Sequence, residues 1–320
     1  MNIPLLLTPA FKDYIWGGTK LRSIFNKKCD FEKVAESWEL SCHKDGNSVI
    51  SNGEYAGKTL SEYIKIHGSS VLGKNCERFE NFPVLIKLID AKDNLSVQVH
   101  PDNEYALRVE GEYGKTEMWY IVDCEEDASL LYGFKKEISK EEFSQRIKDN
   151  TLLEVTQSVK VNKGDVFFIE AGTLHAIGKG ILIAEIQQNS NTTYRIYDYN
   201  RKDKDGNSRE LHIDKACDVT SLCPAAHSSC SEFSQQKGYR IKKLASCDYF
   251  TVHIIETESY ASLYVSEDSF EHILILEGSC VLGSDNYKDM RLEKGDSVFI
   301  PAGYGDFYID GKCTFIKTKV

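Results

Sequence analysis

The sequence lacks features of flexible linkers, of membrane spans and of proteins from oxidising compartments. Only 6 of the 320 residues are proline, and no stretch is of low complexity. No apolar run approaches the roughly 18 residues that a membrane-spanning helix needs, and the apolar cluster Leu5–Leu7 is too short for a signal-peptide core. None of the 10 cysteines forms a Cys-x-x-Cys pair, which is typical of free thiols in a reducing compartment. These absences predict a soluble, cytoplasmic protein.

Positive charge is also in short supply. The chain carries 39 Lys and Arg against 49 Asp and Glu, so its formal net charge is −10. Nucleic acids and acidic membrane surfaces reward broad positive patches, so neither is an expected partner. A small anionic ligand stays possible, but it requires a local cationic pocket. With 41% hydrophobic residues over 320 positions, the chain is long and apolar enough for two ordinary domains.

Short segments rich in Val, Ile, Phe and Tyr dominate the sequence, and most are bounded by Gly, Asp or Asn. This pattern predicts a mainly β protein with many antiparallel strands. The expected strands are Val84–Ile89, Met118–Val122, Val166–Ile169, Ile181–Ile186, Phe250–Ile255, His272–Leu276 and Ser297–Ile300. Four segments favour helices instead: Lys58–His67, Asp102–Val109, Ser139–Lys148 and Leu211–Leu222.

The chain also contains an internal repeat. Lys163-Gly164-Asp165-x-x-Phe168-Ile169-x-Ala171-Gly172 recurs as Lys294-Gly295-Asp296-x-x-Phe299-Ile300-x-Ala302-Gly303. Such a recurrence predicts two β-barrel modules of the same kind, joined near residues 228–238. The copies differ at one position, since His175 in the first corresponds to Asp306 in the second. If the first module holds a metal, the second has therefore lost a ligand and is expected to be structural.

Three separate segments of the first module supply a mixed nitrogen and oxygen ligand set. Gln98 and His100 lie two apart, as do Lys115 and Glu117, and each pair shares one face of a strand. His175 follows the Ala-Gly turn. Two imidazoles, one carboxylate and one amide suit a divalent transition metal, and the net charge near +1 favours a catalytic or substrate-binding site. A structural zinc on Cys217, Cys223, His227 and Cys230 is an alternative, although their spacing is unlike common zinc motifs.

Another candidate site residue follows an apolar strand and a polar loop. Arg195 has the planar group best shaped to hold a phosphate or a developing oxyanion. The competing interpretation is an arginine paired with Asp198 on a solvated face.

The sequence resembles the type I mannose-6-phosphate isomerases, a family of the cupins, in their short bacterial form. The resemblance covers nearly the whole chain and rests on blocks that follow in the family's order. These are Pro9-Ala10-Phe11-Lys12-x-x-Ile15-Trp16-Gly17-Gly18, Glu36-Ser37-Trp38-Glu39-Leu40-Ser41, Pro83-Val84-Leu85-Ile86-Lys87, Gln98-Val99-His100-Pro101-Asp102, Lys115-x-Glu117-Met118-Trp119, Gly172-Thr173-Leu174-His175-Ala176 and Thr193-Tyr194-Arg195.

The resemblance implies two cupin-type jelly-roll barrels with a few accessory helices. Residues 1–235 are expected to form the catalytic domain with helical insertions, and residues 236–320 a metal-free jelly roll. It also implies a zinc-dependent enzyme, with one zinc per chain, that interconverts mannose 6-phosphate and fructose 6-phosphate. The implied zinc ligands are Gln98, His100, Glu117 and His175, and the implied active-site arginine is Arg195.

Other roles follow from the chemistry of an aldose–ketose conversion, which moves a proton between neighbouring carbons through an enediol. Lys115 is a candidate for proton transfer or phosphate contact, and the base stays open among Lys115, Glu185 and a metal-bound water. Glu185, Trp16 and Asn191 are further candidates for contact with the substrate.

One position departs from the family, because members often carry Asp where this chain has Asn191. The amide of Asn191 cannot ionise, so a hydrogen bond is the role left to it. Two other functions remain as alternatives: a non-haem iron cupin oxygenase and a non-catalytic sugar-phosphate-binding regulator.

Overall fold

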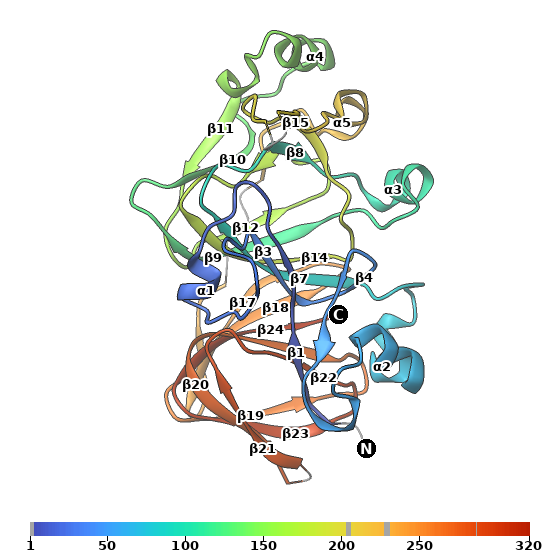
Figure 1. Cartoon of the computed structure of the whole chain (residues 1–320), viewed down its shortest axis with the longest axis vertical. Coiled ribbons are helices and arrows are strands. Elements are labelled where there is room, and N and C mark those ends of the chain that lie inside the picture. The colour runs from blue at the N-terminus through green and yellow to red at the C-terminus, as the bar shows by residue number, and fades with distance from the viewer. Residues whose placement is uncertain (1–2, 203–205, 227–230, 286) are drawn as a thin grey trace.

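The computed structural model describes residues 3–202, 206–226, 231–285 and 287–320. Figure 1 shows β-sheets stacked along the long axis, with the C-terminal part of the chain (orange to red) at one end and the middle of the chain (green to yellow) at the other. The architecture is mainly β, as the sequence predicts. None of the helices among the described residues is long and apolar enough to cross a membrane.

Two sheets form the module that carries the site. The six-stranded sheet has the order β12-β9-β14-β7-β3-β2 and the five-stranded sheet the order β11-β10-β13-β8-β15. The strands of the first are β12 (Val166–Ile169), β9 (Glu117–Cys124), β14 (Ile181–Gln188), β7 (Val84–Ala91), β3 (Glu36–Leu40) and β2 (Ala10–Lys12). Those of the second are β11 (Thr156–Lys160), β10 (Ser129–Phe134), β13 (His175–Ala176), β8 (Val97–Val99) and β15 (Tyr194–Tyr197).

The C-terminal module is built on one large sheet that also takes in the start of the chain. Its path is β16-β17-β18-β24-β20-β22-β1-β6, with β19, β21 and β23 paired off it. The strands are β1 (Leu5–Thr8), β6 (Val49–Ile50), β16 (Ser234–Gln235), β17 (Tyr239–Ser246), β18 (Thr251–Thr257), β19 (Tyr260–Val265), β20 (Glu271–Ser284), β21 (Tyr287–Glu293), β22 (Ser297–Ile300), β23 (Gly305–Asp310) and β24 (Cys313–Lys319). A separate small hairpin joins β4 (Cys42–His43) to β5 (Gly46–Asn47).

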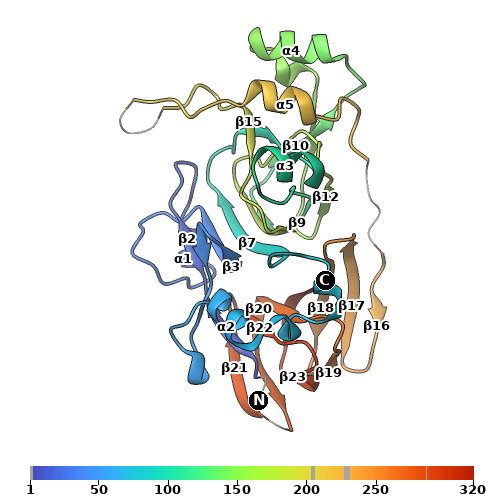
Figure 2. The ribbon, with the colours of Figure 1, turned by 90° about the vertical axis from the view of Figure 1, so that its right-hand side faces the viewer.

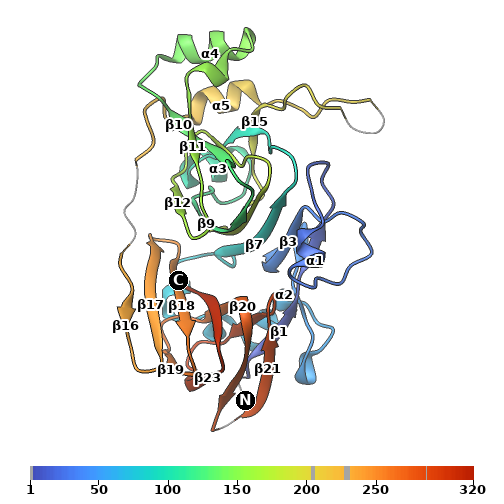
Figure 3. The ribbon, with the colours of Figure 1, turned by 90° about the vertical axis from the view of Figure 1, so that its left-hand side faces the viewer.

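The four expected helices are present, and side-chain caps explain where three of them begin. The Thr59 side chain and Glu62 form a capping box that begins α2, while Asp102 and Ser139 cap α3 and α4. Figures 2 and 3 show α4 and α5 at the end of the molecule farthest from the C-terminal module. The helices are α1 (Lys20–Ser23), α2 (Leu60–His67), α3 (Asn103–Val109), α4 (Lys140–Lys148) and α5 (Ile213–Val219), with 3₁₀ turns η1 (Gly53–Tyr55), η2 (Ser69–Val71), η3 (Lys74–Cys76) and η4 (Leu152–Glu154).

The internal repeat corresponds to the same turn and strand in both modules. Gly164 and Gly295 both have φ of +94°, a conformation that favours glycine. In each copy the following Asp accepts a hydrogen bond from the backbone N–H three residues before it, at 2.7 Å. The strand after each turn pairs antiparallel with a longer strand, β12 with β9 and β22 with β20. Sequence similarity therefore marks a repeated structural unit.

Side chains on the six-stranded sheet alternate between two cores, as a period of two requires. On β7, Ile86 and Leu88 pack into the core between the two modules. Ile89 packs with Trp119 and Ile183 into the core inside the first module. Lys87, Glu117 and Glu185 lie two residues from Ile89, Trp119 and Ile183 and therefore point into the interior of the first module. Buried charged groups are costly there unless they are paired or hydrogen-bonded.

Candidate metal centre and active site

Three adjacent strands bring three of the predicted residues side by side. His175 on β13 lies opposite Gln98 on β8, and Gln98 lies opposite Arg195 on β15. Directly opposed residues of antiparallel strands project to the same face. The three side chains therefore share the face that looks into the module.

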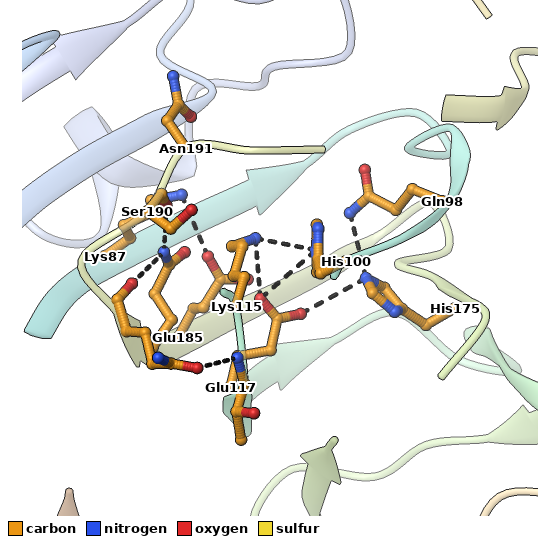
Figure 4. A network of polar contacts seen from close by, with 12 residues as sticks. Lys87, Gln98, His100, Lys115, Glu117, His175, Glu185, Ser190 and Asn191 are labelled. Atoms are coloured by element: carbon orange, nitrogen blue, oxygen red, sulfur yellow. Dashed lines mark hydrogen bonds and ion pairs between the residues drawn. The ribbon is translucent and has the colours of Figure 1, made fainter. Parts of the chain in front are cut away.

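Glu117, at the start of β9, approaches the same spot from the six-stranded sheet, as Figure 4 shows. Its Oε1 lies 3.5 Å from His175 Nε2, and its Oε2 lies 3.7 Å from His100 Nε2. One ligand atom from each of these three residues lies within 4.8 Å of the others. All three residues are buried. The segments that the sequence could not connect thus meet in the fold.

Both imidazoles are held in a form suited to metal binding. His100 Nδ1 faces the backbone carbonyl of Thr192 at 2.9 Å, and His175 Nδ1 faces that of Thr173 at 2.8 Å. A carbonyl only accepts, so each Nδ1 carries the hydrogen and each Nε2 keeps a lone pair toward Glu117. Burial lowers the pKa of His175 to about 4 and that of His100 well below its usual value, with Lys115 adding to the effect at His100. Neutral imidazoles with inward lone pairs are what a metal requires.

The carboxylate of Glu117 is buried with only one cationic side chain of the described part of the chain, Lys115, in direct contact. Neither of its buried oxygens makes a well-directed hydrogen bond among the described residues. Lys115 Nζ lies 2.8 Å from Glu117 Oε2 and 3.0 Å from His100 Nε2. Burial, reinforced by Glu185 and opposed by Lys115, raises the pKa of Glu117 to about 7. An under-satisfied buried carboxylate beside two imidazole lone pairs fits a divalent cation.

The fourth predicted ligand, Gln98, is adjacent but presents the other end of its amide. Its Nε2 lies 3.3 Å from His175 Nε2. Rotation of the amide by half a turn exchanges nitrogen and oxygen without moving the rest of the side chain. Gln98 can therefore offer Oε1 to an ion that His175 also holds.

A buried lysine that the sequence reasoning did not select lies behind this centre. Lys87 Nζ is 3.2 Å from Glu185 Oε1 and 3.7 Å from Glu36 Oε2, and Trp119 Nε1 donates to Glu185 Oε2 at 2.9 Å. Burial raises the pKa of Glu185, but Lys115 and Lys87 outweigh it, so the net pKa lies below the usual value. The signal was a lysine within an otherwise apolar strand, which is rare without a partner.

A pocket of about 240 Å³ opens beside these groups. Gln98, Lys115, Glu185, Asn191, Arg195 and Trp16, all selected from the sequence, line it. Lys87, Tyr14, Glu36 and Arg209, which were not selected, also line it. The pocket thus concentrates cationic side chains within a chain of net negative charge, as an anionic ligand would need.

Arg195 is available to this pocket. The alternative pairing with Asp198 is not what the structure has, because Asp198 binds Arg201 and Arg209. Arg195 Nη1 donates to the backbone carbonyl of Glu210 at 2.8 Å, and its buried Nε has no hydrogen-bond partner among the described residues. Burial and the neighbouring Arg209 lower the pKa of Arg195.

The second module carries different groups at the corresponding positions. Glu271 pairs with Ile300 as Glu117 pairs with Ile169, but it binds Lys317 at 2.6 Å, and Asp306 is exposed. Within the described ranges, His100, Glu117 and His175 are the one group of three His, Cys, Asp or Glu side chains close enough to share an ion. Of the alternative cysteine cluster, Cys217 and Cys223 are free thiols, and His227 and Cys230 lie outside the described residues.

Comparison with known proteins agrees with these observations. Residues 5–126 match the catalytic-domain model of the type I phosphomannose isomerases, and residues 240–320 match the cupin-domain model of the mannose-6-phosphate isomerases. The mannose-6-phosphate isomerase ManA of Bacillus subtilis is 40% identical over 309 residues, covering 96% of each chain. The Streptococcus mutans mannose-6-phosphate isomerase is 38% identical, covering 99% of this chain and 98% of its own.

Solved structures lead to the same family. A crystal structure of the Bacillus subtilis mannose 6-phosphate isomerase superposes with a TM-score of 0.93 at 38% identity, and covers 100% of both chains. The Salmonella typhimurium phosphomannose isomerase in its apo form shares the fold at 18% identity, with a TM-score of 0.79 and 99% coverage of each chain. Together with the site geometry, this full-length similarity shows that the chain belongs to the type I mannose-6-phosphate isomerase family of the cupins.

Proposed function

We propose that this protein is a zinc-dependent isomerase that interconverts mannose 6-phosphate and fructose 6-phosphate. The observation that carries the proposal is the buried Glu117 carboxylate, which faces two neutral imidazoles. Gln98 and Lys115, which contact this group, also line the cationic pocket. Full-length relatives bear the name of this activity.

Gln98, His100, Glu117 and His175 would hold one zinc ion per chain. Two imidazole nitrogens, one carboxylate and one amide oxygen neutralise only one of the two charges of the ion. When bound, the ion would supply a Lewis acid that polarises the sugar oxygens at the two reacting carbons.

The protein groups around that position would move the proton. The reaction removes the hydrogen from C2 of the aldose and returns a proton to C1, while a hydroxyl proton passes from O2 to O1 through an enediol. Glu185 and Lys115 both line the pocket. The cations that lower the pKa of Glu185 keep it ionised near neutral pH, so it is a candidate to accept the C2 proton. Lys115 is the candidate to exchange protons with the sugar oxygens.

The remaining lining residues would bind and orient the substrate. Arg195, with Arg209 beside it, would hold the phosphate or stabilise negative charge that develops on the enediol oxygens. Trp16 lies 3% exposed in the pocket wall, where its ring would pack against the sugar.

We further propose the division predicted from the sequence: a catalytic cupin domain over residues 1–235 and a metal-free jelly roll over residues 236–320. The exposed Asp306 and the Glu271–Lys317 ion pair support a structural role for the second part.

An assay coupled to fructose 6-phosphate, combined with metal analysis, tests the proposal. The zinc-loaded protein is expected to convert mannose 6-phosphate, and chelation is expected to abolish turnover until zinc is restored. Iron content with oxygen uptake would instead identify an oxygenase, and binding of mannose 6-phosphate without turnover would identify a sugar-phosphate sensor.

A further inference from the structure

The side chain of Asn191 is held by a carboxylate from a distant part of the chain. Asn191 Nδ2 donates to Asp45 Oδ2 at 2.8 Å. Asp45 lies at the tip of the hairpin between β4 and β5, 146 residues away in the sequence. A carboxylate only accepts hydrogen bonds, so the amide nitrogen of Asn191, and not its oxygen, must face Asp45. Figure 4 shows the Asn191 nitrogen directed away from the metal ligands.

The backbone that carries Asn191 is fixed by a second acid. Glu112 Oε2 lies 3.4 Å from the backbone nitrogen of Asn191 and 3.4 Å from Thr192 Oγ1. Glu112 is itself held, because its Oε1 contacts Lys44 at 2.5 Å and His43 Nε2 at 3.6 Å. The same hairpin therefore holds both the main chain and the side chain of this segment.

The segment that Asp45 and Glu112 hold contributes to both the pocket and the candidate metal centre. Asn191 lines the pocket of about 240 Å³, and the carbonyl of the next residue, Thr192, binds His100 Nδ1 at 2.9 Å. Among the described residues no hydrogen bond to the side-chain oxygen of Asn191 is found, so this oxygen can accept one from a ligand in the pocket that Asn191 lines.

We propose that Asp45 is a positioning residue that sets the side-chain amide of Asn191 so that Asn191 accepts a hydrogen bond from a hydroxyl of the sugar phosphate. Without Asp45 the amide of Asn191 can rotate by half a turn and present its NH₂ group to the sugar hydroxyl. That group cannot accept a hydrogen bond. The inference rests on the proposed substrate site, since it takes the pocket beside Lys115 and Arg195 as the place where the sugar lies. It gives this chain a specificity contact that needs no ionisable group at position 191.

The experiment pairs an enzyme variant with altered substrates. Asp45→Ala is compared with the wild-type zinc enzyme on mannose 6-phosphate and on its 3-deoxy and 4-deoxy analogues. In the wild type, the analogue that lacks the partner hydroxyl is expected to lose roughly tenfold in kcat/KM, the order of one hydrogen bond. In Asp45→Ala the same comparison is expected to show less than about a threefold loss, because the acceptor is no longer fixed.

Asp123→Ala serves as the matched control. Asp123 is similarly exposed, with 47% of its side chain accessible against 42% for Asp45, and contacts Lys20 at 3.8 Å, outside the pocket lining. In Asp123→Ala, the fall in kcat/KM on the deoxy analogues is expected to equal that of the wild type. The exchanged pair Asp45→Asn with Asn191→Asp keeps one carboxylate and one amide in contact, and is expected to recover the discrimination that Asp45→Ala loses.

Equal deoxy penalties in Asp45→Ala and wild type, with zinc content and melting temperature unchanged, would overturn the inference. If Asp45→Ala fails to fold, the exchanged pair decides, since an absence of hydroxyl discrimination in that folded variant also overturns it. Failure of the proposed function would look different, because wild-type protein would then show no zinc-dependent turnover of mannose 6-phosphate at all.

Discussion

Removal of Lys87 tests how the buried charges behind the metal centre depend on one another. Lys87 is 3% exposed and lies between Glu185 at 3.2 Å and Glu36 at 3.7 Å. At an effective dielectric constant of about 20, Coulomb's law gives roughly 5 kcal/mol for unit charges separated by 3.2 Å. Part of this is offset by the cost of burying the ions, so Lys87→Met is expected to lower the free energy of unfolding by about 3–5 kcal/mol.

The same variant has a predictable effect on the pH profile. Lys87 is one of the cations that lower the pKa of Glu185. Without it this pKa rises, so the carboxylate needs a higher pH to ionise. The acid limb of log kcat/KM against pH is therefore expected to move to higher pH.

Urea unfolding of the zinc-loaded protein and initial rates between pH 5 and 9 provide the two measurements. Lys87→Arg keeps the charge and is the matched control. Lys87→Met combined with Glu36→Gln should recover part of the lost stability, because it removes one of the two stranded carboxylates. A loss of stability below about 1 kcal/mol together with an unmoved acid limb would show that Lys87 does not stabilise the charges of Glu185 and Glu36.

Other perturbations separate the roles of the two modules and of the charged groups near the pocket. His175→Ala is expected to lose zinc and activity, whereas Asp306→Ala at the equivalent position of the second module should keep both, as metal analysis and the coupled assay will show. Arg195→Lys keeps the charge but loses the planar fork, so kcat/KM for mannose 6-phosphate should fall about 10- to 100-fold; an unchanged value would remove Arg195 from the site. Burial raises the pKa of Asp198, but Arg209 and Arg201 outweigh it and hold the pKa below its usual value. The pairing therefore stabilises the protein above pH of about 4 and is lost as the pH falls through the lowered pKa. Unfolding of the wild type and Asp198→Asn at pH 7 and pH 3 should differ most at pH 7, and a constant difference would contradict this.

Local patterns predicted the elements of the fold well. The apolar runs at Val166–Ile169 and Ser297–Ile300 are strands with the predicted limits, because a glycine turn precedes each one. The helix predicted over Leu211–Leu222 was too long, since α5 covers only Ile213–Val219. The pairing of β1 and β6 with the C-terminal sheet was not predicted, because partners far apart in the chain leave no local signal.

At the site, too, contacts within one strand were predicted from the sequence, whereas contacts between strands were not. Spacing by two predicted that Gln98 would share a face with His100, and Lys115 with Glu117, but only strand register brings Gln98 opposite both His175 and Arg195. Lys87 and Arg209 were missed because their place at the site depends on contacts with residues distant in the sequence, which only the fold brings together. Asp45 was missed for the same reason, since it meets Asn191 across 146 residues.

Diffraction at the zinc absorption edge from crystals of the active enzyme would show whether the four predicted ligand side chains hold the ion. We expect one anomalous peak per chain, bonded to His100 Nε2, His175 Nε2, a carboxylate oxygen of Glu117 and the amide oxygen of Gln98, at about 2.0–2.2 Å. Full activity with no peak between these four side chains, or with the ion bound elsewhere, would contradict it.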